Sequence, residues 1–149
     1  MLSVANEIAK QIRLIAMLMM DSDVGINKKV NINTLTDSRL RASVKSELVS
    51  SGDIVVNLLM ANWIIYVEHG RRRGAKMPPP EPIAEWCKRR GLPSDNNTVW
   101  KICRAISEDG IAPRPVIAKA FEIMDREFED NWSDKIIDEI TKELDKLFS

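Results

Sequence analysis

The spacing of apolar residues predicts a helix near the start of the chain. From Val4 to about Met20 an apolar residue recurs every three or four positions, which is the pattern of an amphipathic helix, and Ser3 is placed to act as its N-cap. Its apolar stripe consists of Ile8, Ile12, Ile15 and Met19. The polar stretch at residues 25–36 ends this periodicity and predicts a loop or a weak strand.

The next segments carry the patterns of β-structure. Apolar and polar residues alternate over residues 40–45, as in a strand with one buried face. A β-branched run at residues 54–59 follows a turn at residues 50–53, so together the two runs predict a β-hairpin. The apolar stretch at residues 63–67 fits either a strand or a helical turn, and we expect a third strand there.

Proline and glycine mark the boundaries of the elements that follow. Three prolines at residues 78–80 end an exposed loop, because their rings fit neither a helix interior nor a central strand. A short helix is expected at about residues 81–90, with Pro82 at its first position. The following helix ends at Gly110, and three residues can cap its start: Asp95, Asn96 and Asn97.

The last part of the chain predicts a long helix and a strong charge imbalance. An apolar stripe runs from Ile117 to Leu147, as one helix or as two with a joint near Asn131. Residues 115–149 contain five bases and ten acids, a net charge of −5, whereas residues 68–92 contain seven bases and three acids, a net charge of +4. The molecule is therefore neutral overall but polarised.

These elements predict one α+β domain over residues 1–149: an N-terminal helix, a small antiparallel sheet made of the hairpin and a third strand, two or more helices, and a long C-terminal helix packed on the sheet. The chain has 149 residues, of which 44% are hydrophobic and 30% charged, a composition that supports a core and excludes intrinsic disorder. We find neither a secretion signal nor an apolar run of membrane-spanning length, and we expect assembly in a cytoplasm.

The residue types that carry catalysis and metal binding are sparse. His69 is the single histidine, and no Ser or Cys lies beside it, so we interpret it as a surface or interface residue. Cys87 and Cys103 lack an accompanying set of His ligands, which favours reduced, buried thiols over a zinc site or a disulfide. We expect no enzyme, no metal and no cofactor. Four tryptophans are expected as core or interface anchors: Trp63, Trp86, Trp100 and Trp132.

A basic loop lies between Gly70 and Met77. It contains Arg71, Arg72, Arg73 and Lys76. A P-loop has four residues between its glycines and a Ser or Thr after its lysine, and this loop has neither feature. Two interpretations stay open: a solvated loop, or a surface whose arginine forks contact phosphates or an acidic partner.

The order of these motifs resembles that of a known protein family. An aromatic and Glu-Gly stretch leads into a basic loop, two prolines, a helix with a tryptophan, and a Gly followed by a Pro-Arg pair. This order is similar to that of the tail-completion and head-to-tail joining proteins, or minor tail components, of tailed bacteriophages, chiefly over residues 39–128. The sequence departs from the family at Pro115, where the family often has Phe, and in its triple Arg. The residues that carry the resemblance are Tyr66, Glu68, Gly70, Pro78, Pro79, Trp86, Gly110, Pro113 and Arg114.

The resemblance implies a virion structural protein of the phage neck. Such a subunit forms a homo-oligomeric ring, of about six or about twelve copies, at the portal-to-tail junction. Its implied partners are copies of itself, the portal protein, adjacent neck or tail proteins and packaged DNA in the lumen, with no membrane. The basic loop would contact DNA or the portal.

A small regulatory nucleic-acid-binding protein is the alternative. It would use the loop at residues 71–76 and the helix at residues 81–90, and it would bind duplex in a salt-dependent way.

Overall fold

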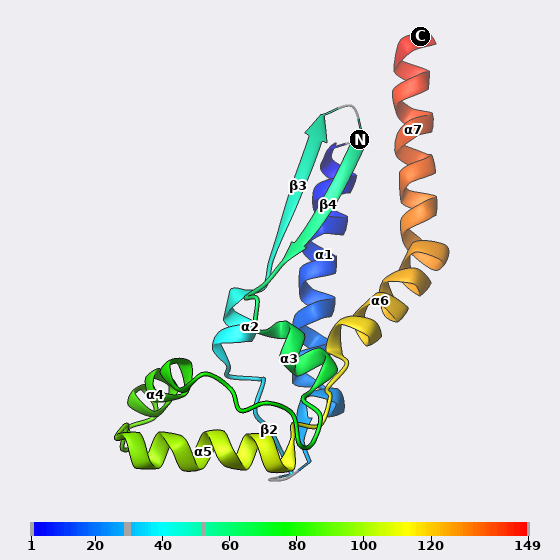
Figure 1. Cartoon of the computed structure of the whole chain (residues 1–149). Coiled ribbons are helices and arrows are strands. Elements are labelled where there is room, and N and C mark those ends of the chain that lie inside the picture. The colour runs from blue at the N-terminus through cyan, green and yellow to red at the C-terminus, as the bar shows by residue number, and fades with distance from the viewer. Residues whose placement is uncertain (1, 29–30, 52, 149) are drawn as a thin grey trace. The chain divides into compact units, whose positions relative to one another are not determined.

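The computed structural model describes residues 2–28, 31–51 and 53–148 (Figure 1). Its described residues form two compact units: unit 1 contains those up to Ile64 and those from Arg114 onward, and unit 2 is Ile65–Pro113. The architecture is α+β, as expected, and in the described residues the strands form two antiparallel sheets of two strands each.

Unit 1 is built on the predicted N-terminal helix, α1 (Leu2–Asp21). Its side chains Ala5, Ala9, Ala16 and Met20 are buried. The predicted apolar stripe is partly buried against a cluster of Ala120, Met124 and Trp132. The proposed N-cap was wrong: Ser3 lies inside the helix, whereas an N-cap has non-helical backbone.

The segment expected as a loop or weak strand contains short elements. A 3₁₀ turn, η1 (Asp23–Gly25), leads into two-residue strands, β1 (Ile26–Asn27) and β2 (Ile32–Asn33), which pair antiparallel. The side-chain amide of Asn33 donates from Nδ2 to the backbone carbonyls of Met20 at 2.8 Å and Ser22 at 3.0 Å. This amide therefore fastens the short hairpin to the end of α1.

The prediction of a strand at residues 40–45 was wrong, because most of this segment forms α2 (Arg39–Ser43). Leu40 and Val44 are both buried, and a spacing of four satisfies a helical turn as well as a strand. The Ser38 hydroxyl caps the turn by accepting from the Arg41 amide at 3.1 Å, which favours the helix.

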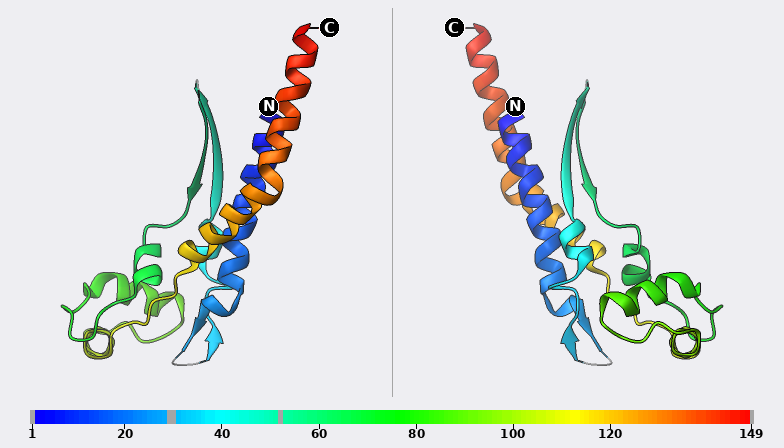
Figure 2. Two further views of the ribbon diagram at one scale, coloured as in Figure 1. Left: turned by 90° about the vertical axis from the view of Figure 1, so that its right-hand side faces the viewer. Right: turned by 90° about the vertical axis from the view of Figure 1, so that its left-hand side faces the viewer.

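The β-hairpin itself is present, with its first strand displaced along the chain. Strand β3 (Lys45–Ser51) pairs with β4 (Asp53–Leu59), and β4 is the second strand that the sequence predicted. Val49 lies opposite Val55 in this register. The hairpin lies along α1, as Figures 1 and 2 show.

The expected third strand was also wrong, because this segment forms α3 (Ile64–His69). The turn begins where the Ile64 amide bonds to the Ala61 carbonyl at 3.1 Å. Ile65 and Tyr66 are 60% and 56% exposed, so no buried sheet face is available to favour an extended strand.

The C-terminal helix changes geometry at the predicted joint. Helix α6 (Val116–Glu127) continues through a π-helical segment, η2 (Phe128–Trp132), into α7 (Ser133–Phe148). Trp132 is buried, and its indole Nε1 donates to the Gln11 side chain of α1. Lys135 of α7 forms an ion pair with Glu7 of α1 at 2.7 Å. These contacts hold the start of α7 beside α1.

Unit 2 contains a pair of helices, α4 (Pro80–Arg89) and α5 (Asn96–Asp109). Pro80, and not Pro82, is the first residue of α4. Asp95 is confirmed as the N-cap of α5, since its carboxylate accepts from the Thr98 amide at 3.1 Å. Cys87 and Cys103 are buried free thiols, as predicted.

Candidate functional site

The basic loop is anchored by hydrogen bonds to the end of α5 and the residues after it. Arg71 and Ile111 exchange two backbone hydrogen bonds, each of 2.8 Å. The Gly74 amide donates to the Ser107 carbonyl at 2.7 Å, and the Ser107 hydroxyl donates to the Ala75 carbonyl. These bonds hold the backbone of the loop against the end of α5.

Two glycines make this anchoring possible. Gly70 and Gly110 have φ values of +67° and +68°, in the region that favours glycine. A Cβ atom at Gly70 would lie 2.3 Å from the Ile111 carbonyl oxygen, and one at Gly110 would lie 2.4 Å from the Arg71 carbonyl oxygen. The two backbones approach so closely only because both positions lack a side chain.

The four predicted contact residues do not share one role. The Arg71 guanidinium donates from Nη2 to the Lys76 carbonyl, and its Nε is buried without a hydrogen-bond partner among the described residues. The Arg71 side chain therefore links the start of the loop to its end at Lys76. Arg72, Arg73 and Lys76 are exposed. These three side chains form the basic site that unit 2 presents, and we call them the basic triad.

The residues that carry the family resemblance divide between the two units. Gly70, Gly110 and Pro113 meet at the anchor of the loop, because a Cβ at Gly70 would also lie 2.7 Å from the Pro113 nitrogen. Arg114 makes its contacts within unit 1, where its guanidinium donates to the Thr34 hydroxyl at 2.7 Å and the Gly25 carbonyl at 3.2 Å. Burial lowers the pKa of this guanidinium.

The remaining resemblance residues lie on or near the surface of unit 2. Tyr66, Pro79 and Trp86 are exposed, whereas Glu68 and Pro78 are half-buried. Pro79 directly precedes the first residue of α4.

The tryptophans divide into one core residue and three surface residues. Trp132 is 4% exposed, whereas Trp63, Trp86 and Trp100 are between 38% and 49% exposed. The guanidinium of Arg90 lies 5.5 Å from the ring centre of Trp86, and that of Arg104 lies 5.3 Å from that of Trp100. Sequence reasoning missed these pairs, although each has the i, i+4 spacing of helical neighbours.

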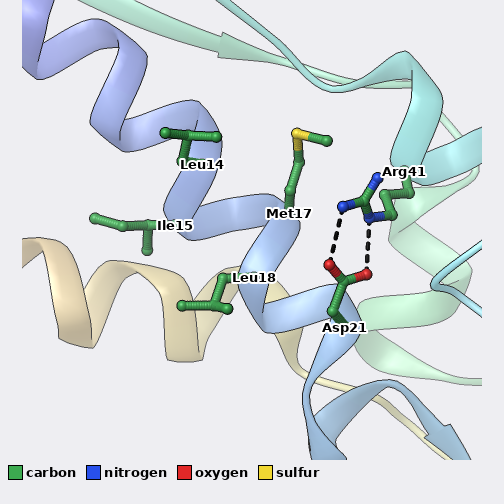
Figure 3. Close-up of a pocket in the computed structure, with 6 residues that line it drawn as sticks. All are labelled: Leu14, Ile15, Met17, Leu18, Asp21 and Arg41. Carbon is green, nitrogen blue, oxygen red and sulfur yellow. Dashed lines mark hydrogen bonds and ion pairs between the residues drawn. The ribbon is translucent and has the colours of Figure 1, made fainter.

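An apolar hollow in unit 1 is bordered by an ion pair. Figure 3 shows it between Leu14, Leu18 and Met17, with the Arg41 guanidinium facing the Asp21 carboxylate. The two bonds of this pair are 2.7 and 2.9 Å long. Beyond this pair the lining is apolar, so the hollow offers little to orient a polar substrate.

The same ion pair predicts a pH dependence of stability. Hydrogen bonds from Arg41 and then Thr36 lower the pKa of Asp21 below its ordinary value of 3.8. A lowered pKa in the folded state adds stability above that value, and this stability is lost as pH falls through the folded pKa. Asp21→Asn should therefore lower the free energy of unfolding by about 1 kcal/mol or less at neutral pH. It should also make this free energy fall less steeply as the pH is lowered, which urea unfolding at pH values from about 7 to about 2 measures. An acid limb as steep as that of the wild type would contradict this assignment.

Residues 2–28, 31–51 and 53–148 contain neither a candidate metal site nor a candidate membrane span. In this part of the chain, no three His, Cys, Asp or Glu residues are grouped so that they could hold a metal ion. None of the described helices combines the length and hydrophobicity needed to span a membrane. Comparison of the chain with protein-family models, with curated proteins and with solved structures finds no match.

Proposed function

We propose that the protein is a structural subunit of a tailed-bacteriophage neck, which forms a homo-oligomeric ring at the portal-to-tail junction and catalyses no reaction. The observation that carries this proposal is the set of large apolar side chains that the described residues leave exposed on α7 and on the β3–β4 hairpin of unit 1. Ile137 and Leu144 of α7 are 60% and 48% exposed, and Val55 and Leu59 of the hairpin are 47% and 46% exposed. Apolar patches of this kind mark protein–protein contacts.

The distribution of charge supports a ring. A closed ring is built from one face of each subunit that meets a different face of its neighbour. The net charge of −5 at residues 115–149 and of +4 at residues 68–92 gives one neutral chain two segments of opposite sign, which different faces of a subunit could present.

The anchored loop supports the family resemblance. Gly70 and Gly110 were identified as separate motif residues, and they form one structural feature. In the proposed ring the basic triad contacts an acidic or phosphate-bearing surface, and Arg71 holds the loop in place.

Counting copies in purified particles tests the proposed function. Quantitative mass spectrometry of particles of the encoding phage should find about six or about twelve copies for each portal ring. Absence of the chain from the particles would reject the neck role.

Removing the basic triad should impair particle assembly. We expect Arg72→Ser, Arg73→Ser and Lys76→Ser together to reduce infectious particles at least about tenfold, because three charged contacts are lost. The matched control replaces three exposed lysines elsewhere, Lys10, Lys28 and Lys101, with Ser and removes the same charge. Plaque titres and electron microscopy of the particles measure the effect. Wild-type titres for the triad variant would remove the loop from the assembly contacts.

A nucleic-acid-binding regulator is the second candidate, favoured by the exposure of three cations on an anchored loop. It predicts that the purified chain binds duplex DNA, and that removal of the triad lowers the salt slope of binding by about three. A chain that binds duplex in this way and is absent from particles would replace the neck proposal.

A further inference from the structure

Helix α7 presents an apolar face that the described part of the chain leaves open. Ile137, Ile140, Leu144 and Leu147 follow the alternating three- and four-residue spacing of a helix–helix seam, and they are between 41% and 76% exposed. Within the described residues, α7 has no buried side chain at all. Its amphipathic pattern is therefore not explained by the packing of unit 1.

The contacts of unit 1 lie on the other side of this helix. Lys135 pairs with Glu7 of α1 at 2.7 Å, so the side of α7 that carries Lys135 faces α1. At 100° per residue, Ile137 and Leu144 lie about 160° to 180° around the helix from Lys135. The C-terminal turns of α7 also extend past the N-terminal end of α1 (Figure 2).

The charged side chains along one edge of the open face are acidic. Asp134 and Asp145 lie about 60° to 80° from Ile137 and form an acidic border along the face. The lysines of α7 lie on the opposite side of the helix: Lys135, Lys142 and Lys146. A partner that presents positive charge beside an apolar surface therefore fits this face, whereas a second α7 would bring a further acidic edge to the contact.

A segment of unit 2 has the required chemistry. Residues 68–92 have a net charge of +4 and include the exposed basic triad. The same segment exposes three large apolar side chains: Met77 at 37%, Trp86 at 38% and Leu92 at 44%. Trp86 also has the Arg90 guanidinium over its ring, which combines charge and apolar surface at one position.

We infer that the apolar face of α7 docks on the basic segment, residues 68–92, of a second copy of this chain. The contact joins two different surfaces, so each copy offers α7 to one neighbour and its basic segment to the other. Repetition of such a contact gives a head-to-tail assembly, which forms a ring when the rotation between neighbours closes. This inference rests on the proposed function and adds to it the two surfaces that meet.

A photo-crosslink tests which surfaces touch. Full-length chain with p-benzoylphenylalanine at position 144 is mixed with ¹⁵N-labelled wild-type chain and irradiated, and the adducts are mapped by mass spectrometry. The expected adduct joins the two isotopic forms and lies on peptides from residues 68–92. The same probe at position 142, on the opposite side of α7, should give no such adduct. Adducts on α7 of the other copy, or within one copy only, would overturn the inference.

Charge reversal tests the acidic border. Asp134→Lys with Asp145→Lys should weaken self-association of the purified chain at least about tenfold in sedimentation velocity, because acid–base contacts become repulsive. Adding Arg72→Glu and Arg73→Glu to the same chain should restore it. Lys142→Glu alters the charge of the same helix on its other side and should leave association unchanged. Circular dichroism establishes that each variant is folded. A loss without rescue, or a chain that stays monomeric at millimolar concentration, overturns the inference.

Failure of this inference differs from failure of the proposed function. Particles that contain a ring of this chain, and that assemble normally with the reversed α7, would reject the docking surfaces and leave the neck role intact. Absence from particles, together with the crosslink between α7 and residues 68–92, would reject the neck role and leave the docking contact intact.

Discussion

Replacing Trp132 with Ala should lower the free energy of unfolding of unit 1 by about 3–5 kcal/mol. The indole is 4% exposed, and it forms the centre of unit 1 with Ala120 and Met124. Truncation leaves a cavity between α1 and the C-terminal helix and leaves the Gln11 side chain without its indole donor. Urea unfolding followed by far-UV circular dichroism measures the change.

Trp63→Ala is the matched control for this prediction. It removes the same side chain from the same unit, but Trp63 is 47% exposed. We expect a loss of about 1 kcal/mol or less, since exposed side chains contribute little to stability. Equal losses for the two variants would show that the π-helical joint at residues 128–132 does not anchor the C-terminal helix.

The parts of the fold that the sequence predicts are those determined by local signals. The stripe of α1 and the cap of α5 at Asp95 depend on spacing and on one side-chain hydrogen bond within a single turn. The C-terminal stripe predicted either one helix or two with a joint near Asn131, and the π-helical segment at residues 128–132 lies at that joint. Such signals need no knowledge of the rest of the molecule.

The errors fall where two structures satisfy the same pattern. Leu40 and Val44 are spaced for either a strand or a helical turn, and the Ser38 cap decides for the turn. The segment at residues 63–67 is apolar enough for a strand, but the structure gives it no neighbouring strand to pair with among the described residues. Pattern alone does not supply that tertiary information.

The composition of the chain indicated where the candidate site lies, but it did not indicate the separate role of Arg71. The concentration of arginine after Gly70 pointed to the loop, and three of its four charged side chains are exposed. The role of Arg71 depends on the contact with Ile111, forty residues away in the chain, which no local signal reports. The open face of α7 was visible as an amphipathic stripe, but a stripe does not reveal what it packs against.

Gly70→Ala should release the basic loop from the end of α5. A non-glycine residue at a φ of +67° costs about 1–3 kcal/mol, and the added methyl group would lie 2.3 Å from the Ile111 carbonyl oxygen. The two backbone bonds between Arg71 and Ile111 would break to relieve this overlap. Hydrogen exchange should accelerate at least about tenfold at the amides of Arg71, Gly74 and Ile111, as measured by NMR or mass spectrometry.

Gly74→Ala separates the cost of backbone conformation from the cost of the overlap. Gly74 has a φ of +76°, but no described atom outside Gly74 and its two chain neighbours lies within 4 Å of an added Cβ. Gly74→Ala has only the conformational cost, so we expect it to keep the bonds between Arg71 and Ile111. Amide hydrogen exchange at these two residues should therefore be slower in Gly74→Ala than in Gly70→Ala. The two variants should also differ in particle assembly. We expect Gly70→Ala to reduce infectious particles as the triad variant does, because it keeps the charges of the triad but displaces them, and we expect Gly74→Ala to have a smaller effect. Equal exchange and equal titres for the two glycine variants would show that the close approach at Gly70 does not position the basic triad.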